Sequence, residues 1–167
     1  MDEIFRRGTC RYFKEKTPVP DEELLTLVKA GMQARAVGNQ KSRDFIIVTR
    51  EDLVKAISHN SIIAGPARKA SAAIVIVGKK DGISFPEEWT FDCAAAAQNI
   101  LIEAEHLGLS TLWMQVYPYQ DRKVHLDHIL DIPDELDPFC IIAVGYADKK
   151  PVRLNRYDPD AVFLDLY

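Results

Sequence analysis

The segment FDCAAAAQNILIEAEHLGL, residues 91–109, constrains the fold more than any other part of the chain. Its Ala, Leu and Glu residues favour helix, and between Cys93 and Ile102 only Gln98 and Asn99 are polar. A helix that is apolar on nearly all sides must be covered on nearly all sides. One small domain can hardly enclose such a helix completely, so the segment predicts that a second subunit supplies part of the cover.

Helices and strands are both expected on either side of this segment. Apolar residues at helical spacing predict helices over residues 21–32 and 121–130, and Thr49 with Asp52 resembles a capping box at the start of another helix. Short apolar runs rich in β-branched residues predict strands over residues 45–49, 72–78, 110–116 and 139–147.

The 167 residues fit one domain, spanning 1–167, because the chain has no internal repeat, low-complexity run or interdomain linker. The mixture of helices and strands indicates an α/β or α+β class, with a mixed β-sheet packed between helices.

The chain is acidic overall, with a formal net charge of −4. Binding to phosphates needs a surplus of Lys and Arg, so we expect neither nucleic acid nor an anionic membrane as partner. No apolar run reaches the roughly 18 residues of a membrane span, and the charged N-terminus is unlike a signal peptide. Three widely spaced cysteines, Cys10, Cys93 and Cys140, indicate a reducing compartment. We therefore expect a cytoplasmic protein.

Arginines gather at both ends of this acidic chain. The stretch RRGTCRYF contains Arg6, Arg7 and Arg11, and Arg153 and Arg156 follow near the other end. The first cluster could be solvated surface charge, a segment that binds nucleic acid, or a binding site for one specific anion. The negative net charge of the chain weighs against nucleic-acid binding. Arginine binds phosphate through paired hydrogen bonds, but the two clusters can share one phosphate only if the fold brings the ends together.

Motifs for other chemistries are absent or weak. The sequence has no G-x-x-x-x-G-K-[ST] phosphate loop, no G-x-G-x-x-G fingerprint and no G-x-S-x-G elbow. His125 and His128 lie three residues apart on a predicted helix, but two histidines without a third ligand are weak evidence for a metal. Carboxylate pairs such as Glu87 and Glu88 lie in predicted turns. We therefore expect no metal site and no side-chain acid or base.

Five motifs, in order along nearly the whole chain, resemble those of the FMN-dependent nitroreductase family. RGTCRYF is similar to R-[RH]-S-x-R-x-[FY], PVPDEELLTLVKAG to the first long helix and its approach, and ARAVGNQKSRDFIIV to A-P-S-A-x-N-x-Q-P-W-x-F-x-V. DCAAAAQNILIEAEHLGLSTLWM is similar to D-x-A-x-A-x-Q-N-x-L-L-x-A-x-x-L-G-L-x-x-x-W, and IIAVGYADKKP followed by Arg156 to [IV]-G-Y-P-x-x-x-P…R. Each motif is loose alone, but five in order are specific.

The resemblance implies an α+β fold in which a mixed β-sheet is packed between helices and two subunits intertwine as a homodimer. Two FMN sites would lie at the subunit interface. The apolar helix would belong to the dimer core, and the tail with its alternating Val162, Leu164 and Leu166 would reach over the partner. The chain lacks the long insertion that covers the active site in larger members, so we expect a more open pocket.

The resemblance also assigns FMN contacts to three parts of the chain. One set would hold the phosphate and ribityl chain: Arg7, Thr9, Arg11 and Arg156, with Gly8 offering only its backbone N–H where the family usually has Arg or His. A second set would come from the other subunit and lie against the flavin: Arg35, Ala36, Val37, Gly38 and Asn39. A third set would pass the isoalloxazine ring with its backbone, and its N–H near Gln115 would face flavin N5: Trp113, Met114, Gln115 and Val116.

The loop of the second set departs from the family pattern. Arg35 and Ala36 replace Pro-Ser, and Lys41, Ser42 and Arg43 replace Gln-Pro-Trp. We hypothesise that Lys41 and Arg43 favour a phosphorylated or acidic partner such as NADPH, and the alternative is a solvated loop.

The implied activity is that of an FMN-dependent NAD(P)H oxidoreductase. A nicotinamide would give hydride to flavin N5 and leave, and a nitroaromatic, a quinone or a similar small oxidant would then take its place in a ping-pong cycle. One alternative is a flavin-binding carrier or sensor, or a degraded paralogue without general reductase activity. A flavin-free dimeric interaction protein is a third interpretation.

Overall fold

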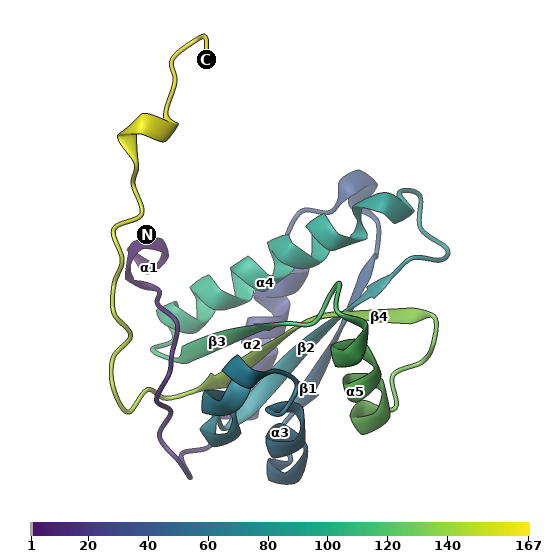
Figure 1. The fold of residues 1–167 in the computed structure, drawn as a ribbon, viewed down its shortest axis with the longest axis vertical. Coiled ribbons are helices and arrows are strands. Elements are labelled where there is room, and N and C mark those ends of the chain that lie inside the picture. The colour runs from purple at the N-terminus through teal and green to yellow at the C-terminus, as the bar shows by residue number, and fades with distance from the viewer. Residues whose placement is uncertain (1) are drawn as a thin grey trace.

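The computed structural model of the protein describes residues 2–167, except for the side chains of residues 62 and 63. A four-stranded sheet with the strand order β1-β2-β4-β3 lies at its centre (Figure 1). The strands are β1 (Arg43–Val48), β2 (Ala72–Lys79), β3 (Ser110–Gln115) and β4 (Leu136–Gly145).

Helices cover both faces of this sheet (Figure 1). The α-helices are α1 (Glu3–Arg6), α2 (Asp21–Met32), α3 (Glu51–Ile57), α4 (Trp89–His106) and α5 (Gln120–Leu130). The 3₁₀ helices are η1 (Val37–Asn39), η2 (Ile62–Lys69), η3 (Pro86–Glu88) and η4 (Pro159–Ala161). One face packs against α2 and α4, and the other packs against α3, η2 and α5.

The central strands are buried on both faces, which explains why they read as continuous apolar runs. On β2, Ile74 and Ile76 belong to the core beneath α2 and α4, whereas Val75 and Val77 belong to the core beneath α3 and α5. Alternate side chains of a strand point to opposite faces, so one strand serves both cores. The predicted α+β class, with a sheet between helices, is confirmed.

The sheet differs from the mixed sheet that the sequence predicted. Every pair of named strands is antiparallel, and the parallel contact among residues 2–167 is an isolated bridge between Thr9 and Thr111. A second, antiparallel bridge joins Phe13 to Ala147. The succession of helices and strands along a chain does not determine strand direction, because a connection can return to either end of a sheet.

The apolar segment forms α4, and Gly108 follows the helix with a φ of 74°, a conformation that favours glycine. The sheet and α2 bury only part of its surface. Phe91 on α4 is 67% exposed, and Leu25 and Met32 on α2 are 51% and 61% exposed. One chain therefore leaves apolar surface of both helices open to solvent.

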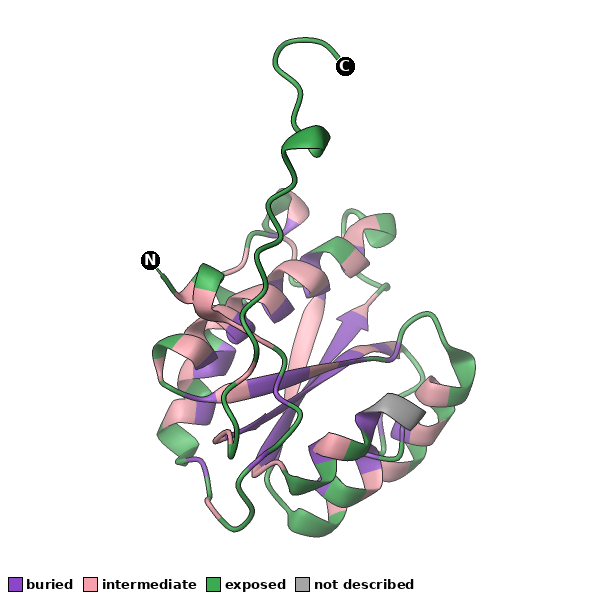
Figure 2. Ribbon diagram, turned by 60° about the vertical axis from the view of Figure 1, so that its left-hand side comes forward, coloured by how far each residue is buried: buried purple, intermediate pink, exposed green. Residues whose placement is uncertain are grey.

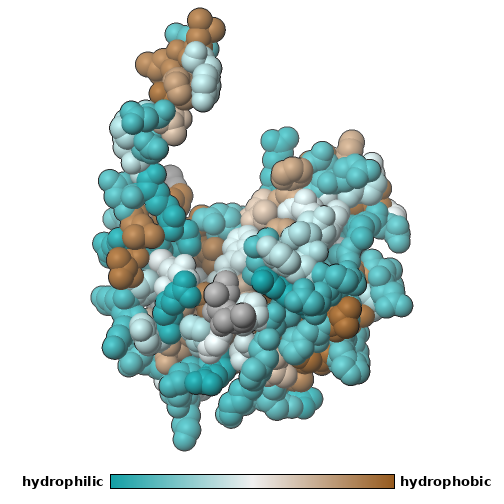
Figure 3. Space-filling model, viewed as in Figure 1, coloured by the Kyte–Doolittle hydropathy of each residue, from teal (hydrophilic) through white to brown (hydrophobic). Residues whose placement is uncertain are grey.

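The chain after β4 runs along the body and then projects away from it as a tail (Figures 1 and 2). Residues 152–167 are all exposed. Hydrophobic side chains gather at the far end of the tail (Figure 3), namely Val162, Phe163, Leu164, Leu166 and Tyr167. The described residues of the same chain leave this apolar surface exposed to solvent.

The predicted capping box at Thr49 and Asp52 is wrong. Helix α3 has Arg50 as its N-cap, without a side-chain cap bond. The Asp52 carboxylate instead accepts hydrogen bonds from the Arg50 guanidinium, with Nε–Oδ1 at 3.1 Å and Nη2–Oδ2 at 2.5 Å. Within residues 2–167, no helix combines the length and apolar character that crossing a membrane would require.

Candidate active site

The two ends of the chain meet beside β3 and line a cavity of about 1110 Å³. The Cys10 N–H donates to the Thr111 carbonyl at 2.8 Å, and the Asp148 N–H donates to the Tyr12 carbonyl at 2.8 Å. The side chains of Cys10 and Phe13 are buried in the core beneath α3 and α5. Backbone pairing and these two buried side chains thus fix the N-terminal segment against the sheet and the C-terminal segment.

Five residues of the predicted phosphate site line this cavity: Arg7, Gly8, Thr9, Arg11 and Arg156. The fold therefore brings together the arginine clusters from opposite ends of the sequence. Their contact with FMN stays a prediction.

The cavity is strongly cationic. Its lining contains no carboxylate and six basic side chains: Arg7, Arg11, Lys149, Lys150, Arg153 and Arg156. Within the described part of the chain, none of the six forms an ion pair with a carboxylate. The Nε of Arg7 is buried and has no hydrogen-bond partner among the described residues. Arginine and lysine side chains bind anions through charge-assisted hydrogen bonds, so this lining suits an anionic ligand.

Gly8 allows the close approach of the two chain ends. A Cβ at this position would lie 2.5 Å from the Pro151 Cβ and 3.2 Å from the Val152 carbonyl oxygen. A side chain at position 8 would therefore collide with the C-terminal segment that carries the cavity's other cations. This contact gives a physical reason for the glycine at position 8.

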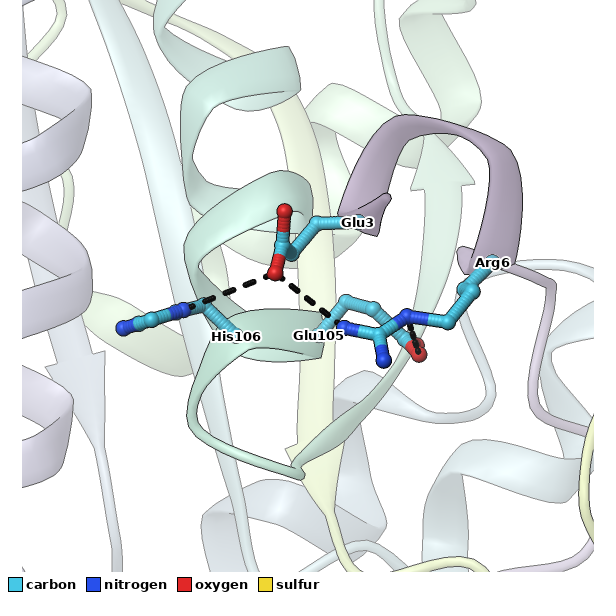
Figure 4. A network of polar contacts seen from close by, with 4 residues as sticks. All are labelled: Glu3, Arg6, Glu105 and His106. Atoms are coloured by element: carbon cyan, nitrogen blue, oxygen red, sulfur yellow. Dashed lines mark hydrogen bonds and ion pairs between the residues drawn. The ribbon is translucent and has the colours of Figure 1, made fainter. Parts of the chain in front are cut away.

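Arg6 has a different role from Arg7, because it holds α1 against the end of α4 (Figure 4). Its Nη2 lies 3.1 Å from Glu3 Oε1, and its Nε lies 3.9 Å from Glu105 Oε1. The Nδ1 of His106 lies 3.7 Å from the same Glu3 oxygen. This network anchors α1, whose Ile4 and Phe5 line the cavity.

The predicted partner-facing loop lies outside the cavity of its own chain. Ala36 is buried, whereas Arg35 is exposed, and Gly38 and Asn39 have φ values of 58° and 54°. The Val37 N–H donates to Asp92 Oδ1 at 3.0 Å. The loop of residues 35–39 thus has a defined shape, but within one chain it does not line the cavity that contains Arg7, Arg11 and Arg156.

Asp92 organises this loop and was missed as a functional residue by sequence reasoning. The carboxylate is buried at the start of α4, and its Oδ2 accepts hydrogen bonds from Gln40 Nε2 at 2.8 Å and Ser42 Oγ at 2.5 Å. The sequence does contain a signal that could have identified Asp92, because it is the acidic residue in the first turn of a largely apolar helix. A buried carboxylate requires several donors, and this loop provides them.

Arg43 links the start of β1 to the end of α2. It is partly buried on β1, and its Nη2 donates to the Ala34 carbonyl at 2.6 Å, just beyond α2. This bond uses one nitrogen of the guanidinium, and the buried Arg43 Nε has no hydrogen-bond partner among the described residues, so the proposed preference of Arg43 for an anionic partner stays a hypothesis. Lys41 is exposed, and its proposed role stays a hypothesis.

The predicted ring-contacting segment forms the end of the edge strand β3 and the residue that follows it. Met114 and Val116 are buried in the core, and Trp113 packs edge-on against Phe139 with ring centroids 6.0 Å apart. Gln115 is exposed. A ligand beside this segment would therefore meet mainly its backbone and the Gln115 side chain.

Arg122 on α5 steadies this segment and was also missed. Its Nη1 donates to the Gln115 carbonyl at 2.7 Å, and its guanidinium lies 4.1 Å from the centroid of the Tyr119 ring. The Gln115 Nε2 in turn donates to the Tyr117 carbonyl at 3.1 Å. These contacts fix the backbone after β3.

The weak metal motif does not gather a ligand set. His125 Nε2 lies 3.2 Å from the Ala56 carbonyl oxygen, and the described residues contain no cluster of three or more His, Cys, Asp or Glu suited to a metal. The three cysteines are buried and unpaired. Burial raises the pKa of the Cys93 thiol to about 12, so this thiol is a poor nucleophile at neutral pH.

Comparison with known proteins gives consistent matches. The model of the nitroreductase family matches residues 61–146. A provisionally named NADH dehydrogenase/NAD(P)H nitroreductase of Archaeoglobus fulgidus is 31% identical over 163 residues, which cover 95% of this chain and 93% of the relative.

Solved structures share the fold. A provisionally named NADH oxidase from Clostridium acetobutylicum has a TM-score of 0.94 at 31% identity, covering 99% of this chain and 100% of that chain. An FMN-dependent nitroreductase from Clostridium difficile has a TM-score of 0.90 at 24% identity and covers all of both chains.

Proposed function

This chain belongs to the nitroreductase family, and from that premise we propose that it is an FMN-dependent NAD(P)H oxidoreductase. The family and the names of the relatives from A. fulgidus and C. acetobutylicum support an oxidoreductase. The FMN dependence of the similarly folded C. difficile protein supports the cofactor. Nitroaromatics, quinones and similar small molecules are the proposed oxidants.

The cationic cavity supports FMN because it suits a phosphate monoester. Arg7, Arg11 and Arg156 would hold the phosphate, since arginine pairs with phosphate oxygens through two parallel hydrogen bonds. The Thr9 hydroxyl and the Gly8 N–H would add neutral donors.

The flavin ring would lie against the backbone of residues 113–116. Met114 and Val116 anchor that backbone in the core, and Arg122 fixes the Gln115 carbonyl at 2.7 Å. A backbone N–H near Gln115 would then orient flavin N5.

When bound, FMN would supply the hydride-transfer chemistry that carries two electrons from NAD(P)H to the oxidant in a ping-pong cycle. The chain's own residues would bind and orient. The cavity arginines would fix the phosphate end, and the backbone at residues 113–116 would fix the ring end. Correct positioning accounts for much of the rate that such sites achieve, and this role needs no side-chain acid or base.

We propose an intertwined homodimer because the site is incomplete in one chain. The loop of residues 35–39 does not line the cavity of its own chain, so in a dimer it would approach the flavin of the partner. The exposed apolar residues Phe91 and Met32, and the tail with Leu164 and Leu166, are surfaces that a second subunit would cover. Large apolar surfaces of this kind are typical of subunit interfaces.

A reducing compartment, the cytoplasm, is the proposed location. The three cysteines are unpaired and buried, which agrees with the rarity of disulfides in reducing compartments.

The single observation that carries this proposal is the cavity lined by six cations and no carboxylate. Titration of the protein with FMN, followed by quenching of flavin fluorescence, tests it. Riboflavin is the matched control because it lacks only the phosphate. One charge-assisted hydrogen bond contributes roughly 1.5–3 kcal/mol, so we expect FMN to bind at least about 100-fold more tightly than riboflavin. Equal affinities for FMN and riboflavin would contradict the proposed site.

A further inference from the structure

A phenylalanine outside the predicted site is fastened to the loop of residues 35–39. Phe85 lies in the short connection between β2 and α4, residues 80–88. The Gln40 Nε2 donates to the Phe85 carbonyl at 3.2 Å, and the Phe85 N–H donates to Gln40 Oε1 at 3.0 Å. One carboxamide thus satisfies both backbone groups of Phe85, as a neighbouring strand would.

The same carboxamide is anchored to the buried carboxylate of Asp92. Gln40 Nε2 donates to Asp92 Oδ2 at 2.8 Å, and Asp92 also holds Val37 and Ser42. An amide nitrogen carries two hydrogens, so it can serve Phe85 and Asp92 together. Phe85 and the loop therefore share one buried support.

The ring of Phe85 lies directly on Gly38. A Cβ at Gly38 would be 2.7 Å from the nearest ring carbon of Phe85, and the φ of 58° also favours glycine there. The residue is nevertheless 46% exposed. A large apolar ring is thus held at the surface by backbone hydrogen bonds instead of being buried.

We propose that Phe85 forms a wall of the oxidant site and selects flat aromatic oxidants by stacking against them, with Gln40 and Asp92 as positioning residues. The inference rests on the proposed function, because that function brings the loop of residues 35–39 to the flavin of the partner subunit. A ring seated on Gly38 would then stand beside that flavin.

The geometry suits flat aromatic molecules. Aromatic rings attract one another in offset and edge-on arrangements, beyond the contribution of buried area. The two hydrogen bonds to Gln40 fix the backbone of Phe85, so little conformational freedom is lost when a ligand packs against the ring. The connection is only nine residues long, residues 80–88, which leaves few other side chains from it to cover an oxidant.

Steady-state kinetics of the FMN-loaded enzyme with two oxidants test the proposal. Naphthoquinone is flat and aromatic, whereas ferricyanide is compact and has no aromatic face. We expect Phe85→Ala to lower kcat/KM for naphthoquinone roughly 3- to 10-fold relative to kcat/KM for ferricyanide. Phe85→Tyr should retain the wild-type preference, because it keeps the ring.

Two further variants separate positioning from general damage. Gln40→Ala removes both bonds to the Phe85 backbone, so it should raise KM for naphthoquinone by a larger factor than KM for ferricyanide. Val124→Ala removes an exposed apolar side chain on α5 and should change neither oxidant. If Phe85→Ala does not fold, Phe85→Leu carries the same test, since Leu keeps an apolar side chain but lacks the ring.

Equal losses for both oxidants, or unchanged kinetics with naphthoquinone, would overturn the role of Phe85. Such a result in an enzyme that binds FMN and turns over would leave the proposed function standing. A wild-type protein that binds no FMN would instead overturn the proposed function and this inference together.

Discussion

Replacing Asp92 with asparagine should destabilise the protein by removing the charge that holds the loop. Asp92 is 2% exposed and accepts hydrogen bonds from the Val37 N–H at 3.0 Å, Gln40 Nε2 at 2.8 Å and Ser42 Oγ at 2.5 Å. The remaining oxygen of an asparagine can still accept from Val37. Its NH₂ group cannot accept from Gln40 and Ser42, which both donate to Oδ2.

The magnitude follows from these two lost bonds. Hydrogen bonds to a charged group contribute about 1.5–3 kcal/mol each. The two donors share one acceptor, and the Ser42 hydroxyl can rotate to accept from the new amide, so their losses will not add in full. We therefore expect Asp92→Asn to lower the free energy of unfolding by about 2–4 kcal/mol, a large part of the roughly 5–15 kcal/mol typical of a native protein.

Urea unfolding followed by circular dichroism measures this loss. The protein concentration must be the same for all variants, because the stability of the proposed dimer would depend on it. Ser42→Ala and the double variant Asp92→Asn/Ser42→Ala complete a cycle. Because the two residues contact each other directly, we expect a coupling energy of about 1 kcal/mol or more.

Two results would refute this reasoning. The first is an Asp92→Asn protein with a free energy of unfolding within about 0.5 kcal/mol of the wild type, as is usual for surface substitutions. The second is a cycle in which the effects of Asp92→Asn and Ser42→Ala simply add.

Three other predictions concern the cavity, the acid side of the stability curve and the tail. Gly8→Ala should weaken FMN binding several-fold, because the new Cβ would meet the C-terminal segment at 2.5 Å and shift the cavity's cations; an unchanged Kd in an FMN titration would contradict it. Burial raises the pKa of Asp137, but hydrogen bonds from Lys80 and Lys123 outweigh burial and leave that pKa below the usual 3.8. These contacts therefore stabilise the fold when the pH is above the unfolded-state pKa of Asp137, and they lose their effect as the pH falls through the lower folded-state pKa. In urea unfolding, Asp137→Asn should lower the free energy of unfolding at pH 7 and make that free energy depend less on pH in the acid range. An unaltered pH profile would argue against this. Deleting residues 158–167 should weaken the proposed dimer, so light scattering should give a lower mass than for the full chain at the same protein concentration; equal masses would count against a role of the tail in assembly.

The regular elements could be predicted because they follow from local pattern and burial. The continuous apolar run of β2 reflects burial on both faces, and the small and apolar residues of α4 reflect its position against the sheet and α2. The direction of the strands was not predictable in the same way, because it depends on where each connection returns.

The candidate site was predictable only in part. The arginines at the two chain ends were candidates for one phosphate grip, and Arg7, Arg11 and Arg156 do line one cavity. The hydrogen bonds from Gln40 and Ser42 to Asp92 were not predicted. Hydrogen bonds between the start of a helix and a distant loop produce no periodic pattern in the sequence.

The visible absorption spectrum of the purified protein, before and after anaerobic addition of NADPH or NADH, tests the proposed FMN-dependent reductase most directly. We expect flavin absorption bands that bleach on addition of the nicotinamide and return when a quinone is supplied. Bound FMN that neither bleaches nor supports turnover would fit a flavin carrier instead of a reductase. A protein that remains colourless after incubation with FMN would contradict the flavin site itself.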